Sequence, residues 1–458
     1  MTKLLVSVFL LLSVQSISSY ASTIAVVDSG NDFTHHELVS KAWTNPLEIP
    51  NNDRDEDKNG YQDDVNGWNF AEGNNKLIDY SYTNTDTPDA RKFFDIQLKS
   101  FLGTVTQEDR VWTKEKFKDE AFMKNLQLFA TWMHGTHVTG ITVKNSPEAR
   151  AIGIKLLPTE VKLPGHKLVE REIAKNGKGA KETIIKFALS TLAKQQTGIF
   201  VDIGRYMSVQ RVDVMNGSFG TSYNAISGMV TLIYTKLFKK DPTAEELKMY
   251  TEYFFATSLE ESKKFLNSSP QTLFIFAAGN EGTDNDLIPS SPTNVIAENK
   301  ISVAATLGSQ GLANFSCYGV KNVEVAAPGV GIYSTTPMDT HLAVSGTSQA
   351  APYVANIAGS VKDANPKLNF REIKKIILET VDVKSWLVGK VLTSGLVNRE
   401  RAIRAAELSR TLDLVGAIAQ SKHDILAQTA NEMAAGPKYF QVPREMILPL
   451  QSPIVFTK

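Results

Sequence analysis

Six short apolar runs, rich in β-branched and small residues, constrain the fold of this chain more than any other feature. They occupy residues 23–28, 151–157, 212–218, 272–280, 301–306 and 323–329. Runs that stay apolar at successive positions, without alternating, are typical of strands buried on both faces of a parallel sheet. Helical patterns such as 225–240 separate several of the runs. The predicted fold is therefore α/β, a doubly wound, mostly parallel sheet flanked by helices.

Three segments depart from this alternation and are predicted to be insertions in one domain that spans 22–409. The segment 76–130 is charged and aromatic, with helix-like stretches but no buried-strand run. Residues 159–179 are lysine-rich and indicate a solvated loop, whereas 241–270 is expected to add one or two amphipathic helices. A C-terminal extension, 410–458, holds a helix candidate followed by proline-interrupted, extended chain.

Charge and cysteine content exclude some partners and bonds. Lys+Arg 49 and Asp+Glu 49 give a formal net charge of +0, with no basic block to neutralise a run of phosphates. We therefore expect no nucleic-acid partner. Cys317 is the only cysteine, so an intrachain disulfide is impossible and we expect a small buried hydrophobic residue there.

The first 21 residues have the organisation of a signal peptide. Lys3 precedes an apolar stretch, 4–14, and small residues lead to a predicted cleavage after Ala21. The stretch is shorter than the ~20 residues of a membrane span, and no later segment has that length and apolarity. We expect an exported protein, secreted or periplasmic, with no membrane span. The alternative is that the stretch is a buried first strand or helix.

Three motifs carry residue types that together perform nucleophilic acyl transfer. VVDSG places Asp28 at the carboxyl end of a predicted strand, where α/β sheets present functional residues. HGTHVTGI is expected to open a helix with His134 in its first turn, and SGTSQAAP to open another with Ser348. Pro352 is expected near the first turn of that second helix, where a missing donor costs little. A carboxylate fixes the imidazole tautomer, the imidazole takes the serine proton, and the hydroxyl attacks a carbonyl.

Each of these residues has another interpretation when taken alone. Asp28 and Asn280 suit turns, and Ser348 suits a helix cap. Zinc ligation is the alternative for His134 and His137, but no glutamate lies between them as in the HExxH pattern. We expect His137 to be a packed structural histidine.

In combination the motifs resemble those of the subtilisin-like serine proteases. The resemblance is carried by AVVDSG, HGTHVTGI, NGSFG, FAAGNEG, VAAPG and SGTSQAAPYVANIAG, in the order aspartate, histidine, serine, and it extends to about Ala406. It implies that Asp28 orients, that His134 is the general base and then the acid, and that Ser348 is the nucleophile. Asn280 matches the side-chain donor of the oxyanion hole, with the Ser348 backbone N–H as the second donor. The implied activity is a secreted serine endopeptidase that forms an acyl-enzyme from polypeptide substrates.

The resemblance also implies a substrate-binding edge. In the resembled family a peptide adds as a strand beside the segment matching NGSFG, and a side-chain pocket lies between that segment and the one matching FAAGN. The implied substrate-binding residues are Ser218, Phe219, Gly220, Ala277, Ala278 and Gly279. Edge-strand addition is a general mode of peptide capture. The alternative for Phe219 is that it is simply a core residue.

The stretch DRDEDKNGYQDDVNGWNF, from residue 53 to 70, predicts a variant calcium loop. Its acidic and amide residues match the early positions of a calcium-binding loop, but Asn66 stands where a bidentate glutamate is usual. The expected ligands of a structural calcium ion are Asp55, Asp57, Asn59, the Tyr61 carbonyl and Asp63. An acidic turn without an ion is the alternative.

One departure from the family concerns activation. Many members carry a propeptide that assists folding, and Asp28 follows the predicted cleavage site too closely to leave room for one. The 76–130 insertion or the C-terminal tail is a hypothetical substitute that covers the active-site cleft. Two rival functions stay open, a catalytically silent peptide-binding protein and a calcium-stabilised interaction protein at the cell surface.

Overall fold

A central sheet of nine strands organises the computed structural model, which describes residues 21–159, 181–427, 438–448 and 451–452. Its strands are β1 (Thr23–Asp28), β2 (Gly67–Asn69), β3 (Arg150–Lys155), β4 (Val214–Gly217), β6 (Leu273–Ala277), β8 (Lys300–Thr306), β9 (Val325–Pro328), β12 (Asp382–Val383) and β13 (Gly395–Leu396). Their order across the sheet is β12-β13-β9-β8-β6-β4-β1-β3-β2. Only the edge pair β12 and β13 is antiparallel. All six predicted runs lie in this sheet, so the α/β prediction is confirmed.

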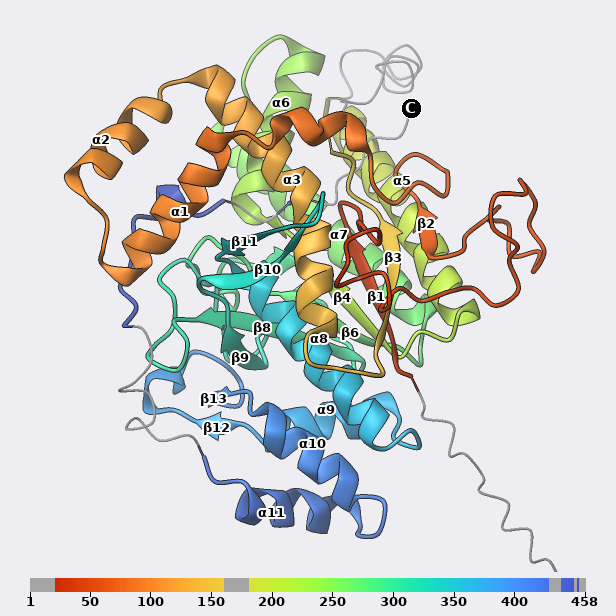
Figure 1. The fold of residues 1–458 in the computed structure, drawn as a ribbon. Helices are drawn as coiled ribbons and strands as arrows, with labels where there is room; N and C mark the ends of the chain where they lie inside the picture. Colours follow the sequence, from red (N-terminus) through yellow and green to blue (C-terminus); the bar gives the residue numbers. More distant parts are fainter. Residues whose placement is uncertain (1–20, 160–180, 428–437, 449–450, 453–458) are drawn as a thin grey trace, which may run out of the picture.

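Helices cover both faces of the sheet, as Figure 1 shows. On one face α3 (Glu120–Val143) and α8 (Thr347–Ala364) pack on the sheet, α9 (Phe370–Glu379) and α10 (Arg399–Leu408) pack against α8, and α11 (Leu414–Asp424) packs against α9 and α10. The other face packs on α5 (Lys181–Val209) and α7 (Ala244–Ser268), with α6 (Tyr223–Phe238) outside them. Successive strand residues serve opposite faces: Ile275 belongs to the α8 side, whereas Phe274 and Phe276 meet α5 and α7. Burial on both faces is why the central strands are mostly apolar on both faces.

The 76–130 insertion is helical, but it is not a separate unit. It forms η1 (Tyr80–Thr85), α1 (Pro88–Leu102), α2 (Gln107–Lys116) and the first half of α3. Because Asp119 caps α3 by accepting the N–H of Phe122, the helix begins fourteen residues before His134. The prediction that His134 lies in a first turn is therefore wrong. The 241–270 insertion is a single helix, α7, whose capping box joins Thr243 and Glu246.

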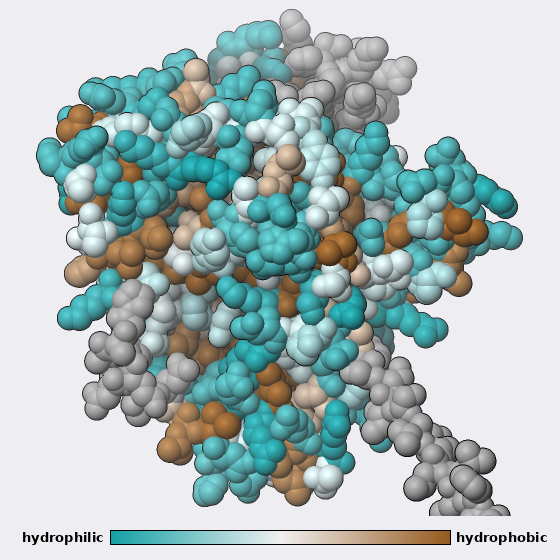
Figure 2. Space-filling model, in the orientation of Figure 1, coloured by the Kyte–Doolittle hydropathy of each residue, from teal (hydrophilic) through white to brown (hydrophobic). Residues whose placement is uncertain are grey.

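Two small antiparallel strand pairs and the C-terminal segment complete the described chain. The pairs are β10 (Ile332–Thr336) with β11 (Thr340–Val344), and β5 (Thr221–Ser222) with β7 (Ser290–Ser291); single turns are η2 (Ser385–Leu387) and η4 (Arg444–Met446). The predicted signal peptide, up to residue 20, and the loop 160–179 lie outside the described residues. Hydrophilic residues dominate the face in Figure 2, and no helix of the described ranges is both long and apolar enough to cross a membrane.

Candidate active site

The carboxyl ends of neighbouring strands bring the predicted residues to one edge of the sheet. Asp28 is the last residue of β1, Ser218 follows β4, and Asn280 lies just beyond β6. The sheet order β6-β4-β1 makes these strand ends adjacent. Functional residues of open α/β sheets gather at such carboxyl ends.

Asp28 and His134 form a buried hydrogen-bonded pair. Asp28 is fully buried, and its Oδ1 lies 2.7 Å from His134 Nδ1 and accepts the Ser29 N–H at 2.7 Å. Because a carboxylate only accepts, the proton of a neutral His134 lies on Nδ1 and leaves Nε2 with its lone pair. Gly135 lets α3 lie close to the loop that follows β1, since a Cβ at this position would lie 2.1 Å from Gly30 O. The imidazole is thus fixed in the tautomer of a general base.

Ser348 is the second residue of α8 and is tied to Ser218 by two hydrogen bonds. Ser348 Oγ donates to Ser218 O at 3.2 Å, and Ser218 Oγ donates to Ser348 O at 2.9 Å. These two described side chains, Ser348 and His134, share no hydrogen bond in this arrangement. A hydrogen bond between them would require the Ser348 hydroxyl to leave Ser218 O.

Pro352 explains why the Ser348 carbonyl is open to Ser218. Pro352 is the sixth residue of α8, deeper than the predicted first turn. An N–H at this position would bond to the carbonyl four residues earlier, which is that of Ser348. Since proline has no such donor, Ser218 Oγ satisfies this carbonyl instead.

Hydrogen bonds to both ends of the Asn280 side-chain amide fix its orientation. Its Oδ1 accepts both the Thr347 N–H at 2.9 Å and the Thr347 hydroxyl at 2.8 Å. These two donors fix which end of the amide is oxygen, so Nδ2 is left to donate. It donates to the backbone carbonyl of Leu448 at 3.1 Å. Sequence reasoning missed Thr347, although its place directly before Ser348 was a signal for it.

The predicted substrate-binding residues are mostly buried. Phe219 is fully buried, with its ring 6.1 Å from that of Phe200 and 6.0 Å from that of Phe276, so its side chain is a core residue. Ala277 and Ala278 are fully buried as well. The backbone is what this edge presents: Gly220 N donates to Gln451 O at 3.0 Å.

Gly279, the last of the predicted substrate-binding residues, packs tightly against Cys317. Gly279 has φ 121°, and a Cβ on it would lie 2.8 Å from Cys317 Sγ. Burial raises the pKa of the Cys317 thiol to about 12. The thiol is therefore protonated at neutral pH, which agrees with the expected buried hydrophobic residue.

His137 supports the β10–β11 hairpin. Its Nε2 lies 3.1 Å from both Ile332 O and Leu342 O. Complete burial lowers its pKa to about 3, so the ring is neutral. Nε2 donates to these carbonyls and so joins α3 to the hairpin, which is the packed structural role expected for His137.

The predicted calcium loop brings together only part of its expected set. Carboxylate oxygens of Asp55, Asp57 and Glu48 lie within 4.8 Å of one another. Asp63 faces elsewhere, because its two oxygens accept the backbone N–H groups of Asn52 and Asp53 at 3.1 and 2.9 Å. Glu48 is the acidic residue that sequence reasoning missed.

The other two expected ligands of this loop are Asn59 and Tyr61. Asn59 Oδ1 accepts the Tyr61 N–H at 2.8 Å, and the Tyr61 ring packs 5.2 Å from the ring of Trp68. Burial raises the pKa of the neighbouring Asp64 to about 6. The three grouped carboxylates supply the oxygen donors that calcium prefers.

The chain combines a parallel α/β sheet, a carboxylate–imidazole pair at a strand end and a serine at a helix start. This combination is the architecture of a serine hydrolase. The model of the subtilase family, peptidase S8, matches residues 20–402, and the chain belongs to this family of serine-type peptidases. Subtilisin-like protease 1 of Plasmodium vivax is 25% identical over 384 residues, which are 84% of this chain and 47% of that protein. Subtilisin BL of Lederbergia lenta is 35% identical over 137 residues, 30% of this chain and 48% of that protein.

Solved structures match the chain as well. A cold-adapted subtilisin-like serine proteinase has 16% sequence identity and a TM-score of 0.40, over 82% of this chain and 89% of that chain. The chain spans about half the length of the curated relatives it matches.

Proposed function

We propose that this chain is an exported serine endopeptidase that hydrolyses polypeptides through Asp28, His134 and Ser348. The observation that carries the proposal is the hydrogen bond from Asn280 Nδ2 to a peptide carbonyl, that of Leu448, at 3.1 Å. A side-chain amide that already accommodates a peptide carbonyl beside the N-terminus of α8 is suited to hold the oxyanion of an acyl-transfer intermediate.

The chemistry follows from the tautomer of His134. Its Nε2 takes the proton of Ser348 as Oγ attacks the substrate carbonyl, and Asp28 stabilises the resulting imidazolium. The carbonyl oxygen becomes an oxyanion that accepts from Asn280 Nδ2 and from the Ser348 N–H. His134 then protonates the leaving amine, and water, deprotonated by the same ring, releases the acyl group.

Labelling tests this function against its two rivals. The full chain is incubated with a serine-directed fluorophosphonate and with casein, beside a Ser348→Ala variant. We expect labelling and cleavage in the parent and neither in the variant. A parent that binds casein without labelling or cleavage is a silent peptide-binding protein, and one that does none of these is an interaction protein.

Peptide binding is proposed to use the backbone of 218–220. The bond from Gly220 N to Gln451 O at 3.0 Å has the form of strand addition at this edge. Ser218, Phe219 and Gly220 contribute backbone groups. The segment 277–279 supplies the facing wall.

We further propose that the tail segments 438–448 and 451–452 cover the active-site cleft. Val442 and Ile447 are buried in the main core. Gln97 of α1 donates a hydrogen bond to Met446 O, and Leu448 O accepts the hydrogen bond from Asn280 Nδ2. Tail and insertion therefore meet beside the predicted site. A tethered segment acts at an effective concentration of about millimolar, so even a weak contact competes with substrate.

Ending the chain after Ile447 is expected to raise kcat/KM on a short peptide about tenfold, because the carbonyl on Asn280 and the partner of Gly220 are removed while the buried anchors remain. The measurement is initial-rate kinetics. A chain that ends after Ser452 keeps both contacts and is the matched control. Equal rates in the two truncated chains would contradict the covering role.

A structural calcium ion is proposed at Asp55, Asp57 and Glu48. Chelation is expected to lower Tm by several degrees, since an ion that binds only the folded state adds stability by mass action. Differential scanning fluorimetry with EGTA measures this, and Ca²⁺ should restore the midpoint. In Asp57→Asn the response should be lost. A midpoint that EGTA leaves unchanged removes the proposal.

Export is proposed to begin with cleavage after Ala21. The new N-terminus at Ser22 would then lie beside the part-buried carboxyl group of Asp363. Ser22 N lies 2.7 Å from Asp363 Oδ1, and burial raises the pKa of Asp363 from 3.8 to about 6. A raised carboxyl pKa means that stability is lost as pH rises from about 4 through 6. An α-ammonium on Ser22 would pair with the carboxylate and remove this loss.

A chain that begins at Ser22 is therefore expected to have a higher Tm at pH 8 than one with an added N-terminal Gly-Ser. The difference should shrink at pH 5, where Asp363 is largely protonated in the extended chain. Thermal melts at both pH values measure it, with Asp363→Asn in each chain as the control. A difference that persists in Asp363→Asn would show that the pair is not its cause.

A further inference from the structure

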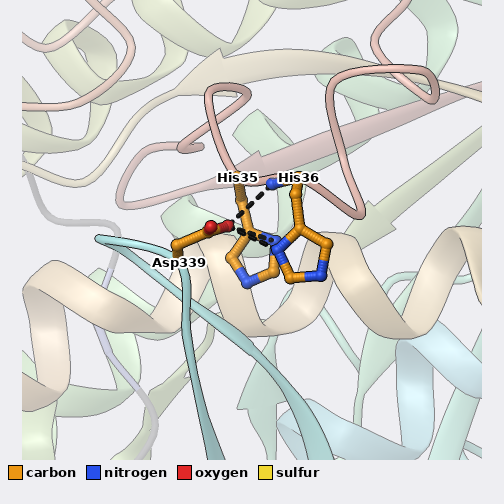
Figure 3. A group of neighbouring side chains, drawn as sticks. All are labelled: His35, His36 and Asp339. Atoms are coloured by element: carbon orange, nitrogen blue, oxygen red, sulfur yellow. Dashed lines mark hydrogen bonds and ion pairs between the residues drawn. The ribbon is translucent and has the colours of Figure 1, made fainter.

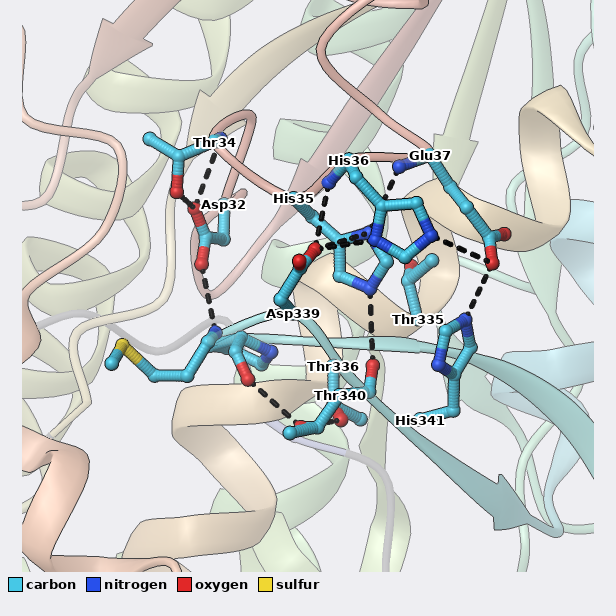
Figure 4. Close-up of polar contacts among 12 residues, drawn as sticks. Asp32, Thr34, His35, His36, Glu37, Thr335, Thr336, Asp339, Thr340 and His341 are labelled. Atoms are coloured by element: carbon cyan, nitrogen blue, oxygen red, sulfur yellow. Dashed lines mark hydrogen bonds and ion pairs between the residues drawn. The ribbon is translucent and has the colours of Figure 1, made fainter.

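Three histidines and two carboxylates from distant parts of the chain meet at the surface beside the β10–β11 hairpin. His35, His36 and Glu37 belong to the loop after β1, and Asp339 and His341 to the hairpin (Figures 3 and 4). We propose that His35, His36 and Asp339 bind a transition-metal ion of the Zn²⁺ type, with Glu37 and His341 beside them.

The donor atoms have nearly the spacing of a metal site. Asp339 Oδ1 lies 2.7 Å from His36 Nδ1 and 3.5 Å from His35 Nδ1, and all three donors lie within 4.8 Å of one another. Donors around a tetrahedral Zn²⁺, at ~2.0–2.2 Å from the ion, are about 3.3 Å apart. Binding would open the contact between His36 Nδ1 and Asp339 Oδ1, with loss of the Nδ1 proton, and draw His35 Nδ1 and Asp339 Oδ1 slightly together. Imidazole with carboxylate favours zinc, copper or nickel over calcium or magnesium.

The tautomer of His35 is already that of a ligand. Its Nε2 lies 3.1 Å from Thr340 O, an atom that only accepts, so Nε2 carries the proton and Nδ1 carries the lone pair. That lone pair faces the Asp339 carboxylate at 3.5 Å, and a cation between these electron-rich atoms relieves their repulsion. Metal-bound histidines characteristically donate their other N–H to a carbonyl in this way. The ion would replace the Glu37 N–H, which Nδ1 accepts at 3.1 Å.

The cluster is held together by contacts that involve no metal. Met338 and Asp339, at the hairpin tip, have φ of 63° and 62°, a left-handed turn that presents the Asp339 side chain to the loop. Met338 N donates at 3.0 Å to the buried Asp32, which also accepts the Tyr80 hydroxyl at 2.9 Å. The hairpin tip is thus fixed to the loop that follows Asp28, and binding would order few groups.

Glu37 and His341 lie beside the three donors without joining them. Glu37 Oε1 lies 2.7 Å from His341 Nε2 and 3.8 Å from His36 Nε2, the ring nitrogen opposite the Nδ1 that contacts Asp339. Because the His36 and Asp339 side chains are exposed, water would complete four-coordination. The ion would then join the loop after the β1 strand to the hairpin that leads into α8.

Zinc titration tests the site in a chain that does not digest itself. The full-length Ser348→Ala protein, stripped of metal, is titrated with ZnCl₂ by calorimetry and melted with and without Zn²⁺. We expect one ion per chain at micromolar affinity or tighter and a rise in Tm. His36→Gln and Asp339→Asn should each weaken this binding at least tenfold, and both retain the fold because His36 and Asp339 side chains are 62% and 57% exposed.

His423→Gln is the matched control, since that side chain is 86% exposed and stands next to Asp424, far along the chain from the cluster. It should bind zinc as the parent does. Zinc bound at His134 or in the acidic loop would survive in His36→Gln, so affinity unchanged in that variant overturns the proposal. An absence of binding in the parent overturns it too, and means that the cluster is only a hydrogen-bonded ion pair network. Neither result depends on peptidase activity.

Discussion

Asp28→Ala is expected to lower kcat about 10⁴-fold, the order measured for the corresponding aspartate of subtilisin. Asp28 Oδ1 fixes the His134 ring from 2.7 Å, and the fully buried carboxylate is the charge that stabilises the imidazolium. Without it, the ring loses both its orientation and its counter-charge at the moment of proton transfer. Since peptide binding uses other groups, KM should change little. Initial rates on a chromogenic peptide measure both constants.

The variant Asp382→Asn is the control that distinguishes a loss of stability from a loss of catalysis in Asp28→Ala. Asp382 is 2% exposed and lies 2.9 Å from Arg401 Nη1, so its replacement also disrupts a buried carboxylate. That variant is expected to have a lower Tm and a nearly normal kcat. A similar fall in kcat in both variants would mean that Asp28 acts only through stability.

Asn280→Ala is expected to lower kcat about 10²–10³-fold, as was measured for the oxyanion asparagine of subtilisin. Asn280 Nδ2 has no competing acceptor other than Leu448 O in the described chain, and Thr347 holds the amide in this orientation. The hydrogen bond from Asn280 Nδ2 reaches its full strength only when the substrate oxygen becomes an anion. Removing the amide should therefore lower kcat more than it raises KM.

Asn314→Ala is the matched control. Asn314 Nδ2 also donates to a tail carbonyl, that of Val442, at 2.7 Å, but it lies away from Ser348 in the proposed site. We expect Asn314→Ala to leave kcat of the chain ending after Ile447 unchanged. A loss in that variant equal to the loss in Asn280→Ala would assign the effect to the tail and not to the oxyanion.

The parallel sheet could be predicted because burial on both faces leaves a local mark. The six predicted strands are mostly apolar, and Asp28 at the end of the first is visible in sequence order. The start of α3 could not be placed, because the residues of the insertion continue the helical pattern and only the cap at Asp119 marks its beginning. Helix boundaries depend on such single contacts more than on periodicity.

Contacts between distant residues were beyond any local pattern. His36 and Asp339 are separated by 303 positions, and Asn280 and Leu448 by 168. Nothing around Leu448 in the sequence marks it as a partner of Asn280. The calcium loop shows the same limit on a smaller scale, since Glu48 lies outside the motif that predicted its partners.

The reciprocal bonds between Ser218 and Ser348 limit how this chain can be re-engineered. The strand edge proposed to align a peptide and the residue proposed to attack it share two hydrogen bonds, at 3.2 and 2.9 Å. A substitution that shifts residues 218–220 to admit a new side chain therefore also displaces the nucleophile. Changes in selectivity at this edge should come at a cost in turnover, whereas changes made in the facing 277–279 wall need not.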